Sequence, residues 1–164
     1  GTMELLLTKP ITEWTVVVAK YAAAVMLVLL ALLPTLVYYW SVGTLAIPAW
    51  NVDSGGTWGS YIGLLLLGAC FCAIGVFASA LTENQIVAFL VAVFLCFFVY
   101  TGFDFIGDFS ALGAWEAGVK YLGIQQHYAG LSRGVVDLRD LAYFGGVIMV
   151  FLLLTRTVLQ SRKW

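Results

Sequence analysis

The residues of this chain that could carry chemistry are few, and most of them gather between positions 104 and 140. The only histidine, His127, lies there among charged residues at Asp104, Asp108, Glu116, Lys120, Arg133, Asp137, Arg139 and Asp140. A histidine with carboxylates could serve general acid–base catalysis or bind a metal ion, but the spacing matches no catalytic or metal-binding pattern. We interpret His127 as an interfacial polar residue. The minor hypothesis is a membrane-embedded enzyme, in which His127 acts with Asp104, Asp108 or Glu116.

The cysteines and the lack of nucleotide-binding motifs point away from enzymatic activity. Cys70, Cys72 and Cys96 lie inside apolar runs, and their spacing fits neither paired zinc knuckles nor a redox CxxC pair. We interpret them as small packing residues. The sequence has no GxxxxGKS/T, HExxH or GxSxG motif. We therefore predict a protein that is not an enzyme, binds no metal or cofactor, and depends on a partner for any ATP hydrolysis.

The composition is that of a membrane protein. Hydrophobic residues make up 62% of the chain and charged residues 10%, with a mean hydropathy of +0.98, whereas about a quarter of the residues in soluble domains are charged. The formal charge of −1 offers no basic surface for nucleic acid. The sequence thus argues against a soluble fold and against nucleic-acid binding, and it predicts that a lipid bilayer covers most of the apolar surface.

Four apolar segments are long enough to cross a bilayer core, which takes about 20 helical residues. They cover residues 16–40, 60–81, 86–103 and 141–159 and predict an all-α integral membrane protein with four transmembrane helices. Pro34 cannot donate to the carbonyl four residues earlier and predicts a kink near Leu30. Thr82 and Gln85 resemble a capping box, so the second and third spans should form a tight antiparallel hairpin. Residues 104–140 are predicted to form short, half-buried helices at one surface.

One face of the second span carries small residues. They recur at steps of four, three and four residues in Gly68, Cys72, Gly75 and Ser79, and Gly59 and Gly63 extend the pattern. In lipid such a face lets the backbone of another helix approach closely, because dispersion drives helix association there. We predict a helix-packing face. The alternative is that glycine is simply frequent in membrane helices.

Basic residues near the span ends predict the orientation. If the spans alternate in direction, one side receives Lys9, Lys20, Arg156, Arg162 and Lys163. The opposite loop, residues 41–59, has no Lys or Arg. Both termini are therefore predicted to be cytoplasmic and residues 104–140 to be extracytoplasmic. Apart from Lys20, no span places an ionisable group in its middle, which disfavours an ion-coupled carrier.

Residues 1–15 predict a short amphipathic helix that precedes the first span on the cytoplasmic side. Met3, Leu6 and Leu7 share one helical face, Pro10 interrupts the helix, and Thr12 is the expected N-cap of the next one. Such an element could lie among the lipid headgroups or dock in a groove on a cytoplasmic partner. The spacing alone leaves both possibilities open.

The segment GTMELLLTKPITEWTVVVAKY resembles the cytoplasmic loop of type-2 ABC transporter permeases. In that family a Gly-Thr-x-Glu-x-Leu-Leu segment, a proline and a lysine precede the third membrane helix, and the loop holds the coupling helix that contacts a separate ATPase subunit. The resemblance implies this contact for Gly1, Thr2, Glu4, Leu6, Leu7 and Pro10. Lys20 also matches. A second permease subunit, like or unlike, and a multi-pass location in the bacterial inner membrane are further implications.

Three other segments resemble one branch of that family more closely. LSRGVVDLRDLAYF, RTVLQSRKW and ALTENQIVAF are similar to the permeases of gliding-motility-associated ABC transporters. Family members have six membrane helices and are mostly exporters. The resemblance therefore implies a chain truncated at its N-terminus, with its spans as the third to sixth helices and residues 104–140 as outer half-helices. The alternative function is a non-transporting scaffold or anchor in a motility or secretion assembly.

The charged segment SRGVVDLRD precedes the last span. Asp137 is expected to cap that helix, with Asp140 at its third position, and Arg133 is expected to pair with one of these two carboxylates. Together with Arg139 these residues form an outer charge cluster. We interpret the cluster as structural, and contact with a substrate is the alternative.

Overall fold

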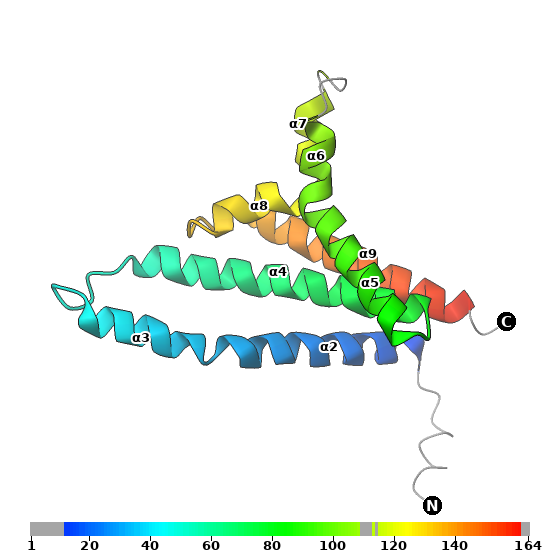
Figure 1. The fold of residues 1–164 in the computed structure, drawn as a ribbon, viewed down its shortest axis with the longest axis horizontal. Coiled ribbons are helices and arrows are strands. Elements are labelled where there is room, and N and C mark those ends of the chain that lie inside the picture. The colour runs from blue at the N-terminus through cyan, green and yellow to red at the C-terminus, as the bar shows by residue number, and fades with distance from the viewer. Residues whose placement is uncertain (1–11, 109–112, 114, 162–164) are drawn as a thin grey trace, which may run out of the picture.

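The structure is a computed structural model that describes residues 12–108, 113 and 115–161. All regular secondary structure in these residues is helical. Within these described residues, four helical stretches are long and apolar enough to cross a membrane: Glu13–Leu45, Ser54–Leu81, Gln85–Gly107 and Leu138–Ser161. This arrangement confirms the predicted all-α membrane fold. Figure 1 shows that the start of the first stretch, the turn at residues 82–84 and the last helix's C-terminal end lie at one end of the molecule, which we call the turn end.

The first stretch consists of two helices, α2 (Glu13–Leu32) and α3 (Thr35–Leu45), separated at Leu33 and Pro34. Thr12 caps α2, as predicted, because its side chain accepts a hydrogen bond from the Thr15 backbone N–H. The interruption lies after the predicted position near Leu30. The Leu33 N–H still donates to the Leu29 carbonyl at 3.1 Å, so the helix breaks only at Pro34, the first residue without a donor.

Helix α4 (Ser54–Leu81) lies at the centre of the molecule and packs against α2, α5, α8 and α9. It begins at Ser54, earlier than the predicted residue 60, because the Asp53 carboxylate accepts a hydrogen bond of 2.9 Å from the Gly56 N–H and caps the helix. In Figure 1 the α2–α3 pair runs along one side of α4. The polar start of α4 thus extends the span beyond its apolar run.

A three-residue turn connects α4 to α5 (Gln85–Phe97), and the expected capping box between Thr82 and Gln85 is wrong. Asn84 is the N-cap, and its Oδ1 accepts from the Ile86 N–H at 3.0 Å and from the Val87 N–H at 3.4 Å. Thr82 instead accepts from the Asn84 N–H at 3.2 Å. The predicted hairpin is confirmed, since α5 doubles back against α4 (Figure 1).

The third span continues beyond its apolar run, through a π-helix, η1 (Phe98–Gly102), into α6 (Phe103–Gly107). Two short α-helices follow among the described residues, α7 (Glu116–Lys120) and α8 (Ile124–Leu131), before the last span, α9 (Leu138–Ser161). Short helices in this region agree with the sequence prediction. In Figure 1 α6 and α7 project away from the bundle, whereas α8 lies beside α4 and α9.

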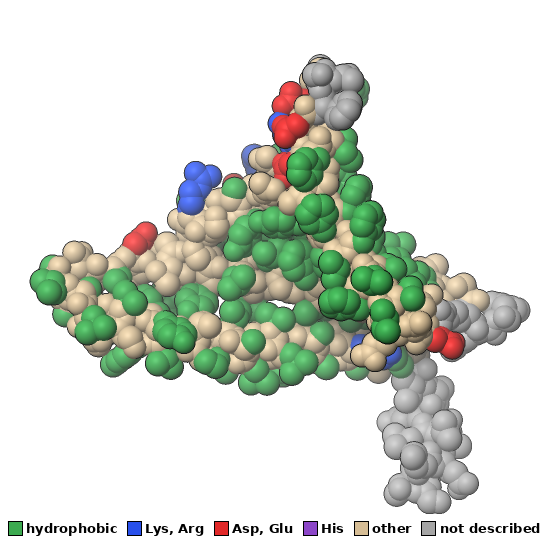
Figure 2. Space-filling view, viewed as in Figure 1, with side chains coloured by type: hydrophobic (Ala, Val, Ile, Leu, Met, Phe, Trp, Pro, Cys, Tyr) green, Lys and Arg blue, Asp and Glu red, His purple; other side chains and the backbone are tan. Residues whose placement is uncertain are grey.

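In the part of the chain that the structure describes, two small clusters form the core, and most of the remaining apolar surface is exposed. One cluster joins Cys70 of α4, Ile124 and Leu131 of α8, and Phe144 of α9. The other, at the turn end, is formed by Val17, Ala73 and Leu152 of three different spans. Hydrophobic side chains cover much of the visible face in Figure 2. An apolar exterior of this extent is what a membrane-spanning helical bundle presents to lipid.

Candidate functional site

His127 is the most constrained polar side chain of the α6–α9 region. Only 3% of it is exposed. Its ring Nδ1 lies 2.8 Å from Oδ1 of Asp140 in the first turn of α9, and its Nε2 lies 3.0 Å from the backbone carbonyl oxygen of Tyr121. His127 is therefore a buried polar residue held by Tyr121, Asp140 and Tyr143, and its position at the membrane interface stays a prediction.

Two tyrosines enclose the His127 ring. Tyr143 of α9 stacks on it, with ring centroids 3.9 Å apart and an interplanar angle of 17°. Tyr121 approaches edge-on at 4.6 Å. The Tyr143 hydroxyl also donates a short hydrogen bond to the Leu122 carbonyl. His127 and Tyr143 together fasten the turn between α7 and α8 onto α9.

The carboxylates that the minor enzyme hypothesis assigns to His127 lie elsewhere. Asp104 of α6 accepts a hydrogen bond of 3.2 Å from the Gln126 side chain, and its Oδ2 is buried without a hydrogen-bond partner among the described residues. Asp108 and Glu116 both bind Lys120. The described residues contain no cluster of histidine, cysteine and carboxylate side chains that could hold a metal ion. The structure thus does not bring together the groups that this hypothesis requires.

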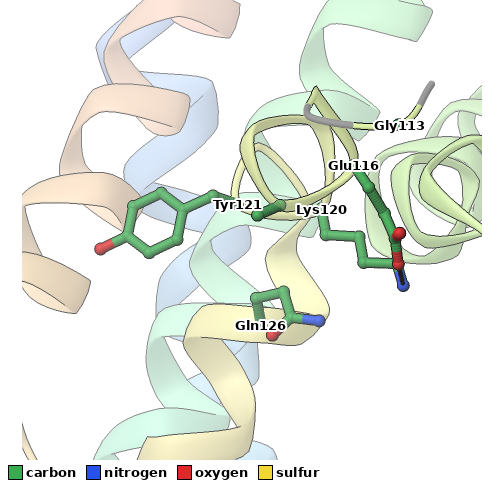
Figure 3. Close-up of a pocket in the computed structure, with 6 residues that line it drawn as sticks. Gly113, Glu116, Lys120, Tyr121 and Gln126 are labelled. Carbon is green, nitrogen blue, oxygen red and sulfur yellow. Dashed lines mark hydrogen bonds and ion pairs between the residues drawn. The ribbon is translucent and has the colours of Figure 1, made fainter.

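Lys120 forms a small ion-pair network at the tip of the α6–α7 projection. Its Nζ lies 2.7 Å from Asp108 Oδ1 and 2.7 Å from Glu116 Oε1. The hydrogen bonds to Asp108 and Glu116 raise the pKa of the Lys120 ammonium. An open cavity of about 560 Å³ adjoins the network, and Figure 3 shows Lys120 and Glu116 side by side on it with Gln126 nearby. The network can fix α7 against α6, but exposed pairs of this kind contribute little stability.

The four residues of the predicted outer charge cluster do not all contact one another, and several bind partners outside the cluster. Asp137 accepts a hydrogen bond of 3.0 Å from the Arg139 N–H and so caps the start of α9, as expected. Asp140 binds His127, whereas the Arg133 Nε donates to the Ala129 carbonyl at 3.0 Å. Within the described residues Arg133 forms no ion pair with Asp137 or Asp140, so that pairing is wrong. It fails because α8 ends in a turn that directs Arg133 back along its own helix.

The row of small residues in α4, from Gly68 to Ser79, packs against a neighbouring helix at some positions and not at others. A side chain at Gly68 would meet Val28 of α2 at 2.9 Å, whereas a Cβ at Gly75 would have nothing within 4 Å. Cys72 is half-buried, and Ser79 is exposed and donates to the Val76 carbonyl. The residues of α4 that are fully buried are instead Cys70, Ala73, Ile74 and Ala78. The row from Gly68 to Ser79 stays a prediction of a packing face.

The two outer glycines of α4 form a closer contact than any in that row. A Cβ on Gly59 would lie 2.4 Å from the Gly134 Cα, and one on Gly63 would lie 2.8 Å from the Leu131 Cβ. Gly134 has a φ of +85°, which L side chains rarely adopt. The Ser60 hydroxyl donates to the Ser132 carbonyl at 2.8 Å in the same place. Glycine on both sides therefore lets the end of α8 rest directly on the α4 backbone.

A polar cleft of about 410 Å³ opens at the turn end, between α2, α4 and α9. Its lining includes Lys20, Ser79, Glu83 and Thr155. The predicted ATPase-contacting residues, Gly1, Thr2, Glu4, Leu6, Leu7 and Pro10, lie outside the described residues. Their role stays a prediction.

The His127 contacts were missed because the sequence gives them no local signal. Tyr121 precedes His127 by six residues and Asp140 follows it by thirteen, and neither interval is a helical repeat. The one available clue was the rarity of histidine in an apolar chain. A lone ionisable side chain that will be buried requires partners.

The described helices define an α-helical, multi-pass integral membrane protein. The sequence pattern of the family described as "ABC-2 family transporter protein" matches residues 1–164. The chain belongs to this family, and it is a membrane permease component of an ABC-2 type transporter. Such permeases are typically non-catalytic transmembrane subunits that act with ATPase subunits. No curated protein and no solved structure matches the chain.

Proposed function

We propose that this permease subunit couples ATP binding in a separate ATPase subunit to movement of its own spans through residues 1–14. The partner would contact Gly1, Thr2, Glu4, Leu6, Leu7 and Pro10. ATP binding would displace this segment, and α2 would carry the displacement into the bundle. Two permease subunits, like or unlike, would enclose the transport path between them.

The packing of Val17 is the observation that carries this proposal. Val17 has no exposed surface and belongs to a buried cluster with Ala73 of α4 and Leu152 of α9. The Arg156 guanidinium of α9 also lies 6.0 Å from the centroid of the Trp14 ring. The first turns of α2 are therefore packed on two other spans. A force on the segment before Thr12 would reach both spans through close-packed side chains, which transmit strain.

The positions of the charged residues also support ATP as the energy source. In the described spans Lys20 lies near the turn end of α2, Asp104 lies in the terminal helix α6, and Asp140 lies in the first turn of α9. Arg156 lies in the half of α9 that approaches the turn end. Ion-coupled carriers usually place ionisable groups within the span interior, because a buried charge is costly and is kept where it is used.

We infer further that transport is outward and that it serves gliding motility, with the turn end and both termini in the bacterial cytoplasm. The direction and the process rest on the resemblance of LSRGVVDLRDLAYF, RTVLQSRKW and ALTENQIVAF to the gliding-motility branch. The orientation rests on Lys20 and Arg156 near the turn end and on the absence of Lys and Arg from residues 41–59. A gliding assay of a strain without the permease, complemented with the wild type, tests the process.

Co-purification tests the coupling. The full-length protein is purified from detergent-solubilised native membranes as the wild type and as a Glu4→Lys, Leu7→Asp double variant. The variant reverses the charge and removes the apolar face of the predicted coupling helix. We expect the wild type to recover an ATPase and the double variant to lose most of it, together with the associated ATP hydrolysis.

The matched control is the double variant Ile47→Asp, Asn51→Lys, both outside the span Glu13–Leu45. It introduces the same two side chains at exposed positions of the opposite end and should leave ATPase recovery unchanged. Equal recovery and equal activity in the wild type and the Glu4→Lys, Leu7→Asp variant would reject the coupling role and favour a non-transporting scaffold.

A further inference from the structure

Both ring nitrogens of His127 face hydrogen-bond acceptors. Nδ1 lies 2.8 Å from the Asp140 carboxylate and Nε2 lies 3.0 Å from the Tyr121 carbonyl oxygen. A backbone carbonyl can only accept, and so can an ionised carboxylate. A neutral imidazole carries a single N–H and could donate to one of these two groups. The imidazolium, with an N–H on each nitrogen, donates to both.

We propose that His127 is an imidazolium in this arrangement and that its two ring protons together latch α8 to α9 and to the turn after α7. The latch joins three separate segments: the turn after α7 through Tyr121, α8 through His127, and the first turn of α9 through Asp140. This inference is independent of the direction of transport and of the ATPase partner.

The stacked ring of Tyr143 favours the charged form. Its centroid lies 3.9 Å from that of His127, with the two rings close to parallel. A cation against an aromatic face is attracted by the ring quadrupole. Asp140 in the first turn of α9 is also favourably placed, because a helix N-terminus stabilises a negative charge. The charged pair thus has a compensating contact on each side.

Because the site is buried, the second ring proton of His127 determines whether both acceptors have a hydrogen bond. His127 is 3% exposed and the Asp140 side chain is 17% exposed, so water cannot readily replace a lost partner. Once His127 becomes neutral, either the Asp140 carboxylate or the Tyr121 carbonyl is left without its hydrogen bond. An unsatisfied buried acceptor costs more than an ordinary hydrogen bond contributes. The latch is therefore complete only while His127 carries both ring protons.

The other ionisable groups around α8 are already engaged or lie farther away. The same side of α9 contributes Tyr143, and its exposed start carries Asp137 and Arg139. The α6–α7 projection contributes Asp104, which binds Gln126, and Lys120, which binds Asp108 and Glu116. Cys70 of α4 and Tyr100 of η1 pack in the adjoining core. Asp140 is the only carboxylate within hydrogen-bond distance of His127 among the described residues.

The sole histidine makes the protonation state directly observable. The full chain is labelled with ¹⁵N-histidine, purified through an affinity tag without histidine, and studied by NMR in lipid nanodiscs across a pH series. We expect a proton on both ring nitrogens at neutral pH in the wild type. In Asp140→Asn the new amide can donate to Nδ1, so we expect a neutral ring with its proton on Nε2. A bare ring nitrogen in the wild type at neutral pH would overturn the proposal.

Hydrogen exchange tests the latch itself. After correction for the intrinsic pH dependence, the amides of α8 in the wild type should exchange roughly tenfold faster or more once the imidazolium signal has disappeared. Asp140→Asn should show no such step, because its hydrogen bonds need no second proton. The matched control is Asp137→Asn, which removes the same charge from the start of α9 without touching His127 and should keep the step. A wild type without the step, or an Asp140→Asn variant that retains it, would disprove the latch.

Discussion

The transmembrane spans and the α6–α8 region use their polar side chains in different ways. Within the spans, most hydroxyl groups bond to carbonyls of their own helix, as in Thr155 to Phe151 at 2.7 Å and Thr157 to Leu153 at 2.7 Å. The Thr35 and Tyr61 hydroxyls, 2.9 Å apart, are an exception that joins α3 to α4. Around α8, polar groups bond between elements, as His127 does with Asp140. Lipid supplies no hydrogen bonds, so a span must satisfy its polar groups within the protein, and the carbonyls of its own helix are the nearest acceptors. The α8 region adds to its apolar core contacts a set of polar contacts that depend on single residues.

Glycine residues form the closest contact between the spans and the α8 region, which we call the glycine joint. The α4 backbone at Gly59 meets the chain at Gly134 almost directly, beside the hydrogen bond from Ser60 to Ser132. Close backbone approach of this kind is how helices associate in membranes. The described residues thus show α8 held to the spans by the glycine joint, by the His127 contacts with α9, and by the apolar cluster of Cys70, Ile124, Leu131 and Phe144.

The largest effect is expected for Gly134→Val. Its Cβ would lie 2.5 Å from the Gly56 Cα, and its φ of +85° is unfavourable for a β-branched residue. Overpacking and backbone strain together should cost about 4 kcal/mol. The measurement is the midpoint of denaturant-induced unfolding in mixed micelles, with Gly145→Ala, which has open space around its Cβ, as the control. A normal midpoint for Gly134→Val would show that the joint is not closely packed.

The next largest effect is expected for His127→Ala. The substitution leaves the mostly buried Asp140 carboxylate without its partner and opens a void against Tyr143. A loss of about 3 kcal/mol in the free energy of unfolding is expected. Gln125→Ala, an exposed neighbour on the same helix, is the control and should change little. If both variants unfold alike, the polar contacts of α8 contribute no more than an exposed side chain.

The spans could be predicted because each is a long apolar run, whereas their ends and the α8 contacts could not. Asp53 extends α4 by capping it before the apolar residues begin, and Asp104 continues the third span within α6. A hydropathy pattern cannot distinguish a polar residue at the end of a helix from a polar residue in a loop. The His127–Asp140 pair is different again, since only the folding of α8 onto α9 brings the two residues together.

A smaller effect, on the order of 1 kcal/mol, is expected for Asn84→Ala. Asn84 accepts two backbone N–H groups at the start of α5, and alanine would leave both donors without that acceptor. Gln85→Ala serves as the comparison. In a capping box the Gln85 side chain would stabilise the start of α5, whereas in the observed cap the Asn84 side chain does so. The unfolding midpoints of the two variants decide between these arrangements, and a larger loss for Gln85→Ala would restore the capping box.

The smallest effect is expected for Glu116→Gln at the tip of the α6–α7 projection. Lys120 keeps Asp108 as a partner at 2.7 Å, and partly exposed pairs are weakened by solvent and salt, so the unfolding midpoint should not change measurably. The hydrogen bonds to Asp108 and Glu116 raise the Lys120 pKa. Their contribution is therefore complete below the unfolded-state pKa of lysine and is lost only as the pH rises past the higher folded-state value. The wild type and the variant should show parallel midpoints between about pH 6 and pH 9. A marked loss for Glu116→Gln in low salt would show that polar contacts hold the whole projection in place, and not only α8.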